Sequence, residues 1–185
     1  MKCRLGLLAA SAIAALSLAS LPAQPVRLSD GKVYFTRPPS LIKASTTQNA
    51  AFVWGAIYYF VLNIPENAGE PLGSVAISAD PSPDPVTFDL GHTYAFEGTR
   101  DRQAARLSLE PVAEAQKTGV ITVTFNPPVP PGKTVTTALF PNHNPMGGVY
   151  LYGVTAFPAG GNPYGQFLGY GRIQIYDRGG LWPFW

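Results

Sequence analysis

Cysteine is almost absent from this chain of 185 residues, and the one that occurs, Cys3, lies close to its first residue. No intrachain disulfide can form, which excludes the small disulfide-stapled scaffolds of many secreted proteins. Asn-x-Ser/Thr sequons are also missing, so the sequence gives no support for eukaryotic secretion. The fold must rest on packing alone, and a chain of this length can bury a sufficient core.

Histidine and the common catalytic motifs are scarce as well. His92 and His143 are the only histidines, and neither Gly-x-Ser-x-Gly nor His-Glu-x-x-His occurs. The Gly-Lys-Thr triplet at residues 132–134 is not a phosphate-binding loop, because Pro127 stands where that motif needs its first glycine. The sequence therefore favours a non-catalytic protein that needs no cofactor, with an enzyme of unrecognised chemistry as the alternative.

A long apolar segment occurs only near the first residue. Lys2 and Arg4 precede an apolar stretch at residues 5–18, and Ala23 follows as a small residue at a cleavage point. This order predicts a helical secretory signal peptide over residues 1–23 and an exported protein, in the periplasm or at the cell surface. A retained N-terminal anchor is the alternative, because the residue two places before Ala23 is leucine rather than a small residue.

Excess charge of one sign is missing too. The chain has 13 Lys+Arg against 11 Asp+Glu, and removal of residues 1–23 takes away two basic residues and no acidic one. A balanced mature chain has no electrostatic footprint for nucleic acid. The longest later apolar run, at residues 50–62, is too short for the ~20 residues of a spanning helix. We expect no transmembrane helix after signal cleavage.

Glycine and proline are plentiful, at 19 each, and short β-branched and aromatic runs lie between them. This pattern predicts many strands joined by turns. We expect a single immunoglobulin-like β-sandwich of eight or nine strands at residues 24–180, followed by an aromatic tail at 181–185. The expected strands lie at residues 32–36, 52–64, 74–78, 86–89, 106–110, 119–125, 133–140, 149–157 and 168–176.

Local patterns add detail to this fold. Residues 52–64 are apolar at both odd and even positions, which predicts a central strand covered on both faces. Residues 119–125 and 133–140 flank a proline-rich turn and suggest a hairpin with a long loop. Residues 100–107 could form one or two helical turns. Gly169 and Gly171 lie in an expected strand, where glycine permits a bend or a close backbone approach.

The densest charge cluster contains Glu97, Arg100, Asp101 and Arg102. Arginine side chains can bind carboxylates or sugar acids through two parallel hydrogen bonds. The cluster is therefore a candidate binding site. The alternative is that the two acids neutralise the two arginines and hold the loop against the sandwich.

Aromatic residues form the second group of candidates. Tyr164 and Tyr170 lie in a stretch rich in tyrosine, phenylalanine and glycine, and exposed aromatic rings can stack on sugars; the alternative is that these rings belong to the core. Trp182, Phe184 and Trp185 make the tail unusually aromatic. The tail could fold back as a hydrophobic plug, or dock onto a partner or a membrane interface.

A metal site is a weaker alternative. His143 and Met146 occur in one loop, and imidazole with thioether sulfur suits copper. Two ligands make an incomplete set, and a loop histidine is usually solvated.

Several short sequence segments resemble those of a known family. They lie at residues 33–39, 54–60, 64–71, 96–100, 148–158 and 164–172. In this order the chain resembles the exported cyanobacterial proteins grouped as domain of unknown function 2808, over about residues 32–178. The resemblance implies a photosynthetic bacterial source and an envelope location, and it brings no catalytic residue with it.

Together these observations predict an exported envelope protein that serves as a non-catalytic binding or structural module for an envelope protein or glycan. A periplasmic copper carrier, an uncharacterised enzyme and a small outer-membrane barrel are the alternatives.

Overall fold

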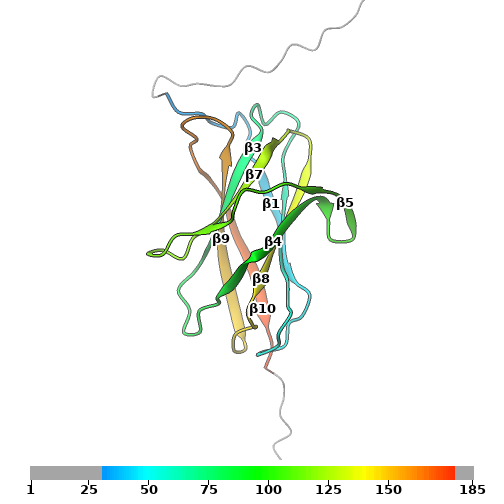
Figure 1. Cartoon of the computed structure of the whole chain (residues 1–185), viewed down its shortest axis with the longest axis vertical. Helices are drawn as coiled ribbons and strands as arrows, with labels where there is room; N and C mark the ends of the chain where they lie inside the picture. The colour runs from blue at the N-terminus through cyan, green and yellow to red at the C-terminus, as the bar shows by residue number, and fades with distance from the viewer. Residues whose placement is uncertain (1–30, 178–185) are drawn as a thin grey trace, which may run out of the picture.

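The computed structural model describes residues 31–177, and in these residues every regular element is a strand. The strands form two five-stranded antiparallel sheets that pack face to face (Figure 1). This confirms the predicted immunoglobulin-like β-sandwich. No helix capable of crossing a membrane occurs in this part of the chain. The predicted signal peptide and the aromatic tail lie outside the described residues.

Each sheet mixes strands from distant parts of the sequence. The first sheet has the order β1 (Ser40–Thr46), β2 (Tyr58–Asn63), β8 (Thr134–Pro141), β4 (Phe88–Thr99) and β5 (Arg102–Leu107). The second has the order β10 (Gln166–Ile175), β9 (Gly148–Pro158), β3 (Leu72–Ala79), β7 (Ile121–Val129) and β6 (Ala113–Glu114).

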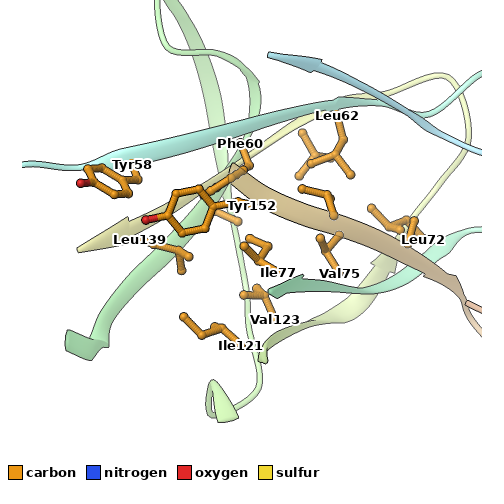
Figure 2. Packing of buried hydrophobic residues seen from close by; sticks show 14 of the residues in the cluster. Tyr58, Phe60, Leu62, Leu72, Val75, Ile77, Ile121, Val123, Leu139 and Tyr152 are labelled. Carbon is orange, nitrogen blue, oxygen red and sulfur yellow. The ribbon is translucent and has the colours of Figure 1, made fainter. Parts of the chain in front are cut away.

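The core fills the space between the sheets, because alternate residues of each strand point inward. On β3, Val75 and Ile77 are buried while their neighbours are partly exposed. Figure 2 shows Phe60 of the first sheet close to Tyr152 of the second, and their ring centroids lie 5.6 Å apart, edge to face. Such aromatic pairs add stability beyond the area they bury, which suits a domain that has no disulfide.

Strand β2 is buried on both faces, as the sequence predicts. Tyr58 and Phe60 face the core, while Tyr59 and Val61 are also less than a tenth exposed on the outer face. Tyr59 belongs to a second, smaller apolar cluster with Phe96. The outer face of this sheet therefore carries its own packed aromatic group.

The strand expected at residues 52–64 is too long, since only residues 58–63 are extended and paired. Residues 52–57 form a loop in which Phe52 has φ +56° and Gly55 has φ +74°. Left-handed backbone cannot continue a β-strand, so the aromatic run is interrupted by its own geometry.

The expected hairpin between residues 119–125 and 133–140 is wrong. Strand β7 pairs with β3 and β6, whereas β8 pairs with β2 and β4 in the other sheet. The proline-rich segment carries the chain across the sandwich. Prolines cannot donate to a ladder, and this segment connects the sheets without joining its two strands to each other.

Two shorter expectations also fail. Residues 32–36 make only an isolated bridge, from Val33 to Pro163, and not a strand. The helical turns expected at residues 100–107 are replaced by β5, which pairs with β4. Pairing with β4 in the same sheet outweighs the weak local helix preference at that site.

The two glycines expected to allow a bend or a close approach do both. Gly169 has φ +114° and lies at a bulge between β10 and β9. A Cβ on Gly171 would lie 2.7 Å from the Cβ of Ala44. Glycine thus lets β10 approach β1 and close one edge of the sandwich.

Candidate binding surface

An aromatic cluster lies on the outer face of the first sheet, and Ala138 of β8 is at its centre. Tyr59 of β2 and Tyr94 of β4 are both register partners of Ala138, one on each side. Because alanine is small, the two tyrosines lean over it, and their hydroxyl oxygens are 3.2 Å apart. Phe96 stacks beside Tyr94 with ring centroids 6.1 Å apart. The result is a firm aromatic base on a face that normally carries polar residues.

Two arginines lie over this base. The guanidinium carbon of Arg106 is 4.1 Å from the ring centroid of Tyr94, and that of Arg100 is 5.7 Å from the ring of Tyr59. Both arginines are exposed. Cation–π contact stabilises the guanidinium groups over the rings while both side chains stay accessible to a ligand. We call Tyr59, Tyr94, Arg100 and Arg106 the arginine–tyrosine surface.

The hairpin between β4 and β5 positions both arginines. Arg106 is the register partner of Phe96, next to Tyr94 on the same face. Gly98 has φ +95°, and a Cβ there would collide with the backbone carbonyl oxygen of Arg102. The Gly98 carbonyl also accepts a hydrogen bond of 2.6 Å from the Thr136 hydroxyl, which fixes the hairpin on β8.

The charges on this surface are not neutralised within it. Glu97 pairs with Lys133, the residue before β8, at 3.1 Å, rather than with an arginine. In residues 31–177, no carboxylate lies within 4 Å of the guanidinium groups of Arg100, Arg102 or Arg106. The alternative in which Glu97 and Asp101 pair with Arg100 and Arg102 therefore finds no ion pair in the described part of the chain.

Burial and a hydrogen bond keep the tyrosine beneath Arg100 neutral. Burial, followed by the hydrogen bond to Tyr94, raises the pKa of Tyr59 to about 12, although the nearby Arg100 charge acts in the opposite direction. Tyr59 is therefore a neutral ring at physiological pH. The net charge of the surface comes from its arginines.

A shallow hollow of about 320 Å³ adjoins the surface on the side of β1. Lys43 and Arg100 both line it, and Asp101 is its one acidic lining residue. Two cations against one acid give the hollow a positive balance, so it is suited to an anionic group.

The two candidate tyrosines of the last third of the chain have different surroundings. Tyr170 lies edge to face with Phe167, with ring centroids 5.2 Å apart, and both rings are more than half exposed. A Cβ on Gly153 would lie 3.3 Å from the Phe167 ring, so the pair rests on a glycine. Tyr164 instead packs on Tyr34, at 4.8 Å. Tyr170 and Phe167 are thus an exposed aromatic pair and not core.

The copper alternative gains no further ligand. The His143 ring lies 5.7 Å from the Trp54 ring, and Met146 is 46 % exposed. Within residues 31–177, no three His, Cys, Asp or Glu side chains gather as a metal site. Copper binding remains a prediction without a complete ligand set. Trp182, Phe184 and Trp185 lie outside the described residues.

Three of the residues that form the arginine–tyrosine surface, Tyr59, Tyr94 and Arg106, are not among the predicted site residues. Tyr59 and Tyr94 are 35 positions apart, and only the register with Ala138 brings them together. Arg106 follows the predicted charge cluster in the sequence but is not among the predicted site residues. Alternation of Tyr94 and Phe96 along one strand face is the local signal that could have revealed them.

Two antiparallel sheets around one apolar core define the class of this protein as an immunoglobulin-like β-sandwich. The chain belongs to the family described as Protein of unknown function (DUF2808), whose model matches residues 32–175. No curated protein matches the sequence.

Among solved structures, the chain is similar to three from bacteria. Against the collagen adhesin of Staphylococcus aureus the TM-score is 0.40 at 9 % identity, covering 72 % of this chain and 48 % of that one. A collagen-binding domain from a Staphylococcus aureus adhesin gives 0.39 at 9 % identity, over 71 % and 94 %. The C-terminal domain of AspA of Streptococcus pyogenes gives 0.39 at 13 % identity, over 72 % and 47 %. The chain thus matches about half the length of two of them.

Proposed function

We propose that this protein is an exported, non-catalytic binding module of a bacterial envelope, and that the arginine–tyrosine surface binds an anionic glycan. Export is inferred from the basic, apolar and small-residue order of residues 1–23. The periplasm or the cell surface is the location that fits this inference. A binding role is also consistent with the scarcity of catalytic motifs in the chain.

The observation that carries the proposal is the pair of guanidinium groups held over tyrosine rings with no carboxylate partner among the described residues. Arginines on a protein surface commonly find an acidic neighbour, whereas here Glu97 is engaged by Lys133. Fixed guanidinium groups lose little conformational entropy when a ligand binds, which favours recognition.

The chemistry of the surface favours sugar acids. A guanidinium group binds a carboxylate through two parallel hydrogen bonds, and the tyrosine rings beneath the arginines hold the guanidinium groups in place. Arg100 and Lys43 at the adjoining hollow offer a second anionic position. A polyuronate chain carries a carboxylate on each sugar, at regular intervals, and so can occupy both positions.

The test is binding of polygalacturonate to residues 24–185, measured by isothermal titration calorimetry at low and at high salt. We expect binding that weakens with salt, and a loss of about tenfold or more in Arg100→Ala and in Arg106→Ala. Arg172→Ala is the matched control, because Arg172 is exposed on the other sheet and bonds to Gln174. Equal affinity in all three variants, or no binding by the unchanged chain, would exclude this surface as the site.

A second candidate ligand is a neutral glycan stacked on Phe167 and Tyr170. The observation that favours it is the exposed ring pair above Gly153. Binding of an uncharged polysaccharide that is lost in Phe167→Ala and unaffected by Arg106→Ala would identify this second site.

A further inference from the structure

One end of the sandwich presents apolar side chains that the core does not use. The loop at residues 47–57 and the loop between β8 and β9 meet there, and β10 runs to the same end (Figure 1). Trp54 is 74 % exposed, Phe52 is 62 % exposed and Met146 is 46 % exposed. We call Phe52, Trp54, His143 and Met146 the aromatic tip.

The tip is held rigidly by one buried asparagine. Asn144 is fully buried, its side-chain amide donates to the carbonyls of Gln48 and Ala50, each at 2.9 Å, and its oxygen accepts from the Tyr58 hydroxyl. Its backbone also donates to Val53. A buried polar network whose hydrogen bonds are all made, at the edge of the core, fixes one loop conformation.

Strain accompanies this rigidity. Phe52 is the one residue other than glycine with positive φ in residues 31–177. A left-handed conformation is costly for an aromatic residue, and it persists only where the surroundings impose it. The loop therefore holds an exposed phenylalanine in an unfavourable backbone state, which points to a use for the ring outside the described fold.

The chain leaves the sandwich beside this tip. The Tyr176 amide donates to the Asn49 carbonyl at 2.7 Å, and the Ala51 amide donates to the Tyr176 carbonyl at 2.9 Å. The Gly147 amide donates to the carboxylate of Asp177 at 2.9 Å. Both loops of the tip thus contact the last described residues.

We propose that the chain's own segment at residues 181–185 docks on the aromatic tip. Four of its five residues are large and apolar, namely Leu181, Trp182, Phe184 and Trp185. Asp177 contacts Gly147, next to Met146 of the tip, and four extended residues span up to about 14 Å, so the segment begins within that distance of Asp177. The short connection gives a high effective concentration, and contacts that are weak in solution are enough to close it.

The chemistry of the two parts is complementary. Aromatic rings pack edge to face with one another, and the Met146 thioether packs well against an aromatic edge. Anionic lipid is a poorer occupant, because the carboxylates of Asp84 and Asp177 hold the Met146 and Gly147 amides at this end.

The distribution of tryptophan makes the proposal directly measurable. The chain has three tryptophans, one in the tip and two in the segment. The variant Trp182→Phe/Trp185→Phe of residues 24–185 keeps an aromatic segment, and its tryptophan fluorescence comes from Trp54 alone. The same chain cut after Asp177 also reports only Trp54, with the segment removed.

We expect acrylamide to quench Trp54 about twofold more strongly in the cut chain, with a red-shifted emission, because docking covers a ring of 150–250 Å². Phe52→Gly in the longer chain should raise the quenching likewise, since glycine accepts the left-handed backbone while the docking ring is lost. Phe167→Ala, on the far sheet, is the matched control and should change nothing.

Equal quenching in the long and the cut chain overturns the proposal. So does protection of Trp54 that disappears on dilution, which would assign the contact to a second copy of the chain. Protection that occurs only with phosphatidylcholine vesicles would assign the tip to a lipid surface and also overturn it.

Discussion

Tyr59 and Tyr94 share a single alanine: both are register partners of Ala138, and their hydroxyl oxygens meet 3.2 Å apart above it. Any larger residue at that position would separate the rings and displace the arginines that lie over them. The small side chain of Ala138, beneath the arginine–tyrosine surface, therefore sets how its rings are arranged.

A change at Ala138 should disturb binding more than folding. Ala138→Val adds two methyl groups between the tyrosines, and we expect a stability loss of about 1–2 kcal/mol from overpacking. The loss of polygalacturonate affinity should exceed the loss caused by Tyr59→Phe, which removes one hydroxyl only. Calorimetry and urea denaturation of the two variants measure both effects, and unchanged affinity in Ala138→Val would contradict the role assigned to the alanine.

Arginine at position 106 should not be replaceable by lysine. A lysine keeps the charge but lacks the planar fork and stacks less well on Tyr94. We expect Arg106→Lys to weaken polyuronate binding about threefold to tenfold, with no measurable change in unfolding free energy. Arg172→Lys is the control on the other sheet. Full affinity in Arg106→Lys would mean that only net charge matters.

The buried Asn144 should be one of the most sensitive polar positions. Asn144→Ala leaves the Tyr58 hydroxyl and the carbonyls of Gln48 and Ala50 without their partner. We expect a loss of about 2–4 kcal/mol in urea unfolding. Asn142→Ala, in the same loop but exposed with one bond to Thr87, should lose under about 1 kcal/mol. Equal losses would show that burial of the amide is unimportant.

The close approach of β10 to β1 predicts a destabilising substitution and a second substitution that compensates for it. Gly171→Ala places a Cβ 2.7 Å from that of Ala44, and we expect a loss of about 1–3 kcal/mol. Ala44→Gly in the same chain should restore most of it, because the opposing methyl is gone. Gly161→Ala is the control, since a Cβ there meets nothing within 4 Å. Absence of rescue would refute steric contact as the cause.

Stability should fall in alkali through the buried tyrosines. Burial raises the pKa of Tyr59 from 10 to about 12, and burial raises the pKa of Tyr152 above its ordinary value as well. Above pH 10 the unfolded chain releases phenolic protons that the folded chain retains. Stability is therefore full below pH 10 and declines as the pH rises towards 12. Urea midpoints at pH 8 and 11 test this, and Tyr59→Phe should show a smaller decline.

Local sequence patterns predicted the strands that are regular along their length. Residues 119–125 alternate cleanly and residues 149–157 are rich in β-branched and aromatic residues, and they correspond to β7 and β9. The strand expected at residues 52–57 is a loop. Their aromatic composition favours a strand, but the backbone of Asn144, some ninety positions away, bonds to Phe52 and Val53 and holds the loop. Strand β1 at Ser40–Thr46 was missed, since its pattern is weakly apolar and only pairing with β2 defines it.

The candidate site was likewise predictable from the sequence only in part. The charge density along the chain was enough to find Glu97, Arg100, Asp101 and Arg102. The partner of Glu97 is Lys133, which comes directly before β8, and the sequence pattern paired that strand with the wrong neighbour. A charge cluster shows where ions are concentrated, and strand neighbours decide which of them are neutralised.

The sequence by itself determined an all-β sandwich held by packing, because the turn residues, the two-residue alternation and the lack of disulfide cysteines are local facts. The tertiary structure alone decided which strands neighbour one another and which side chains share a face. A β-ladder joins residues by register across the sheet, and register depends on the whole core. For that reason Ala138, which no local pattern marks, is the residue that places two tyrosines beneath two arginines.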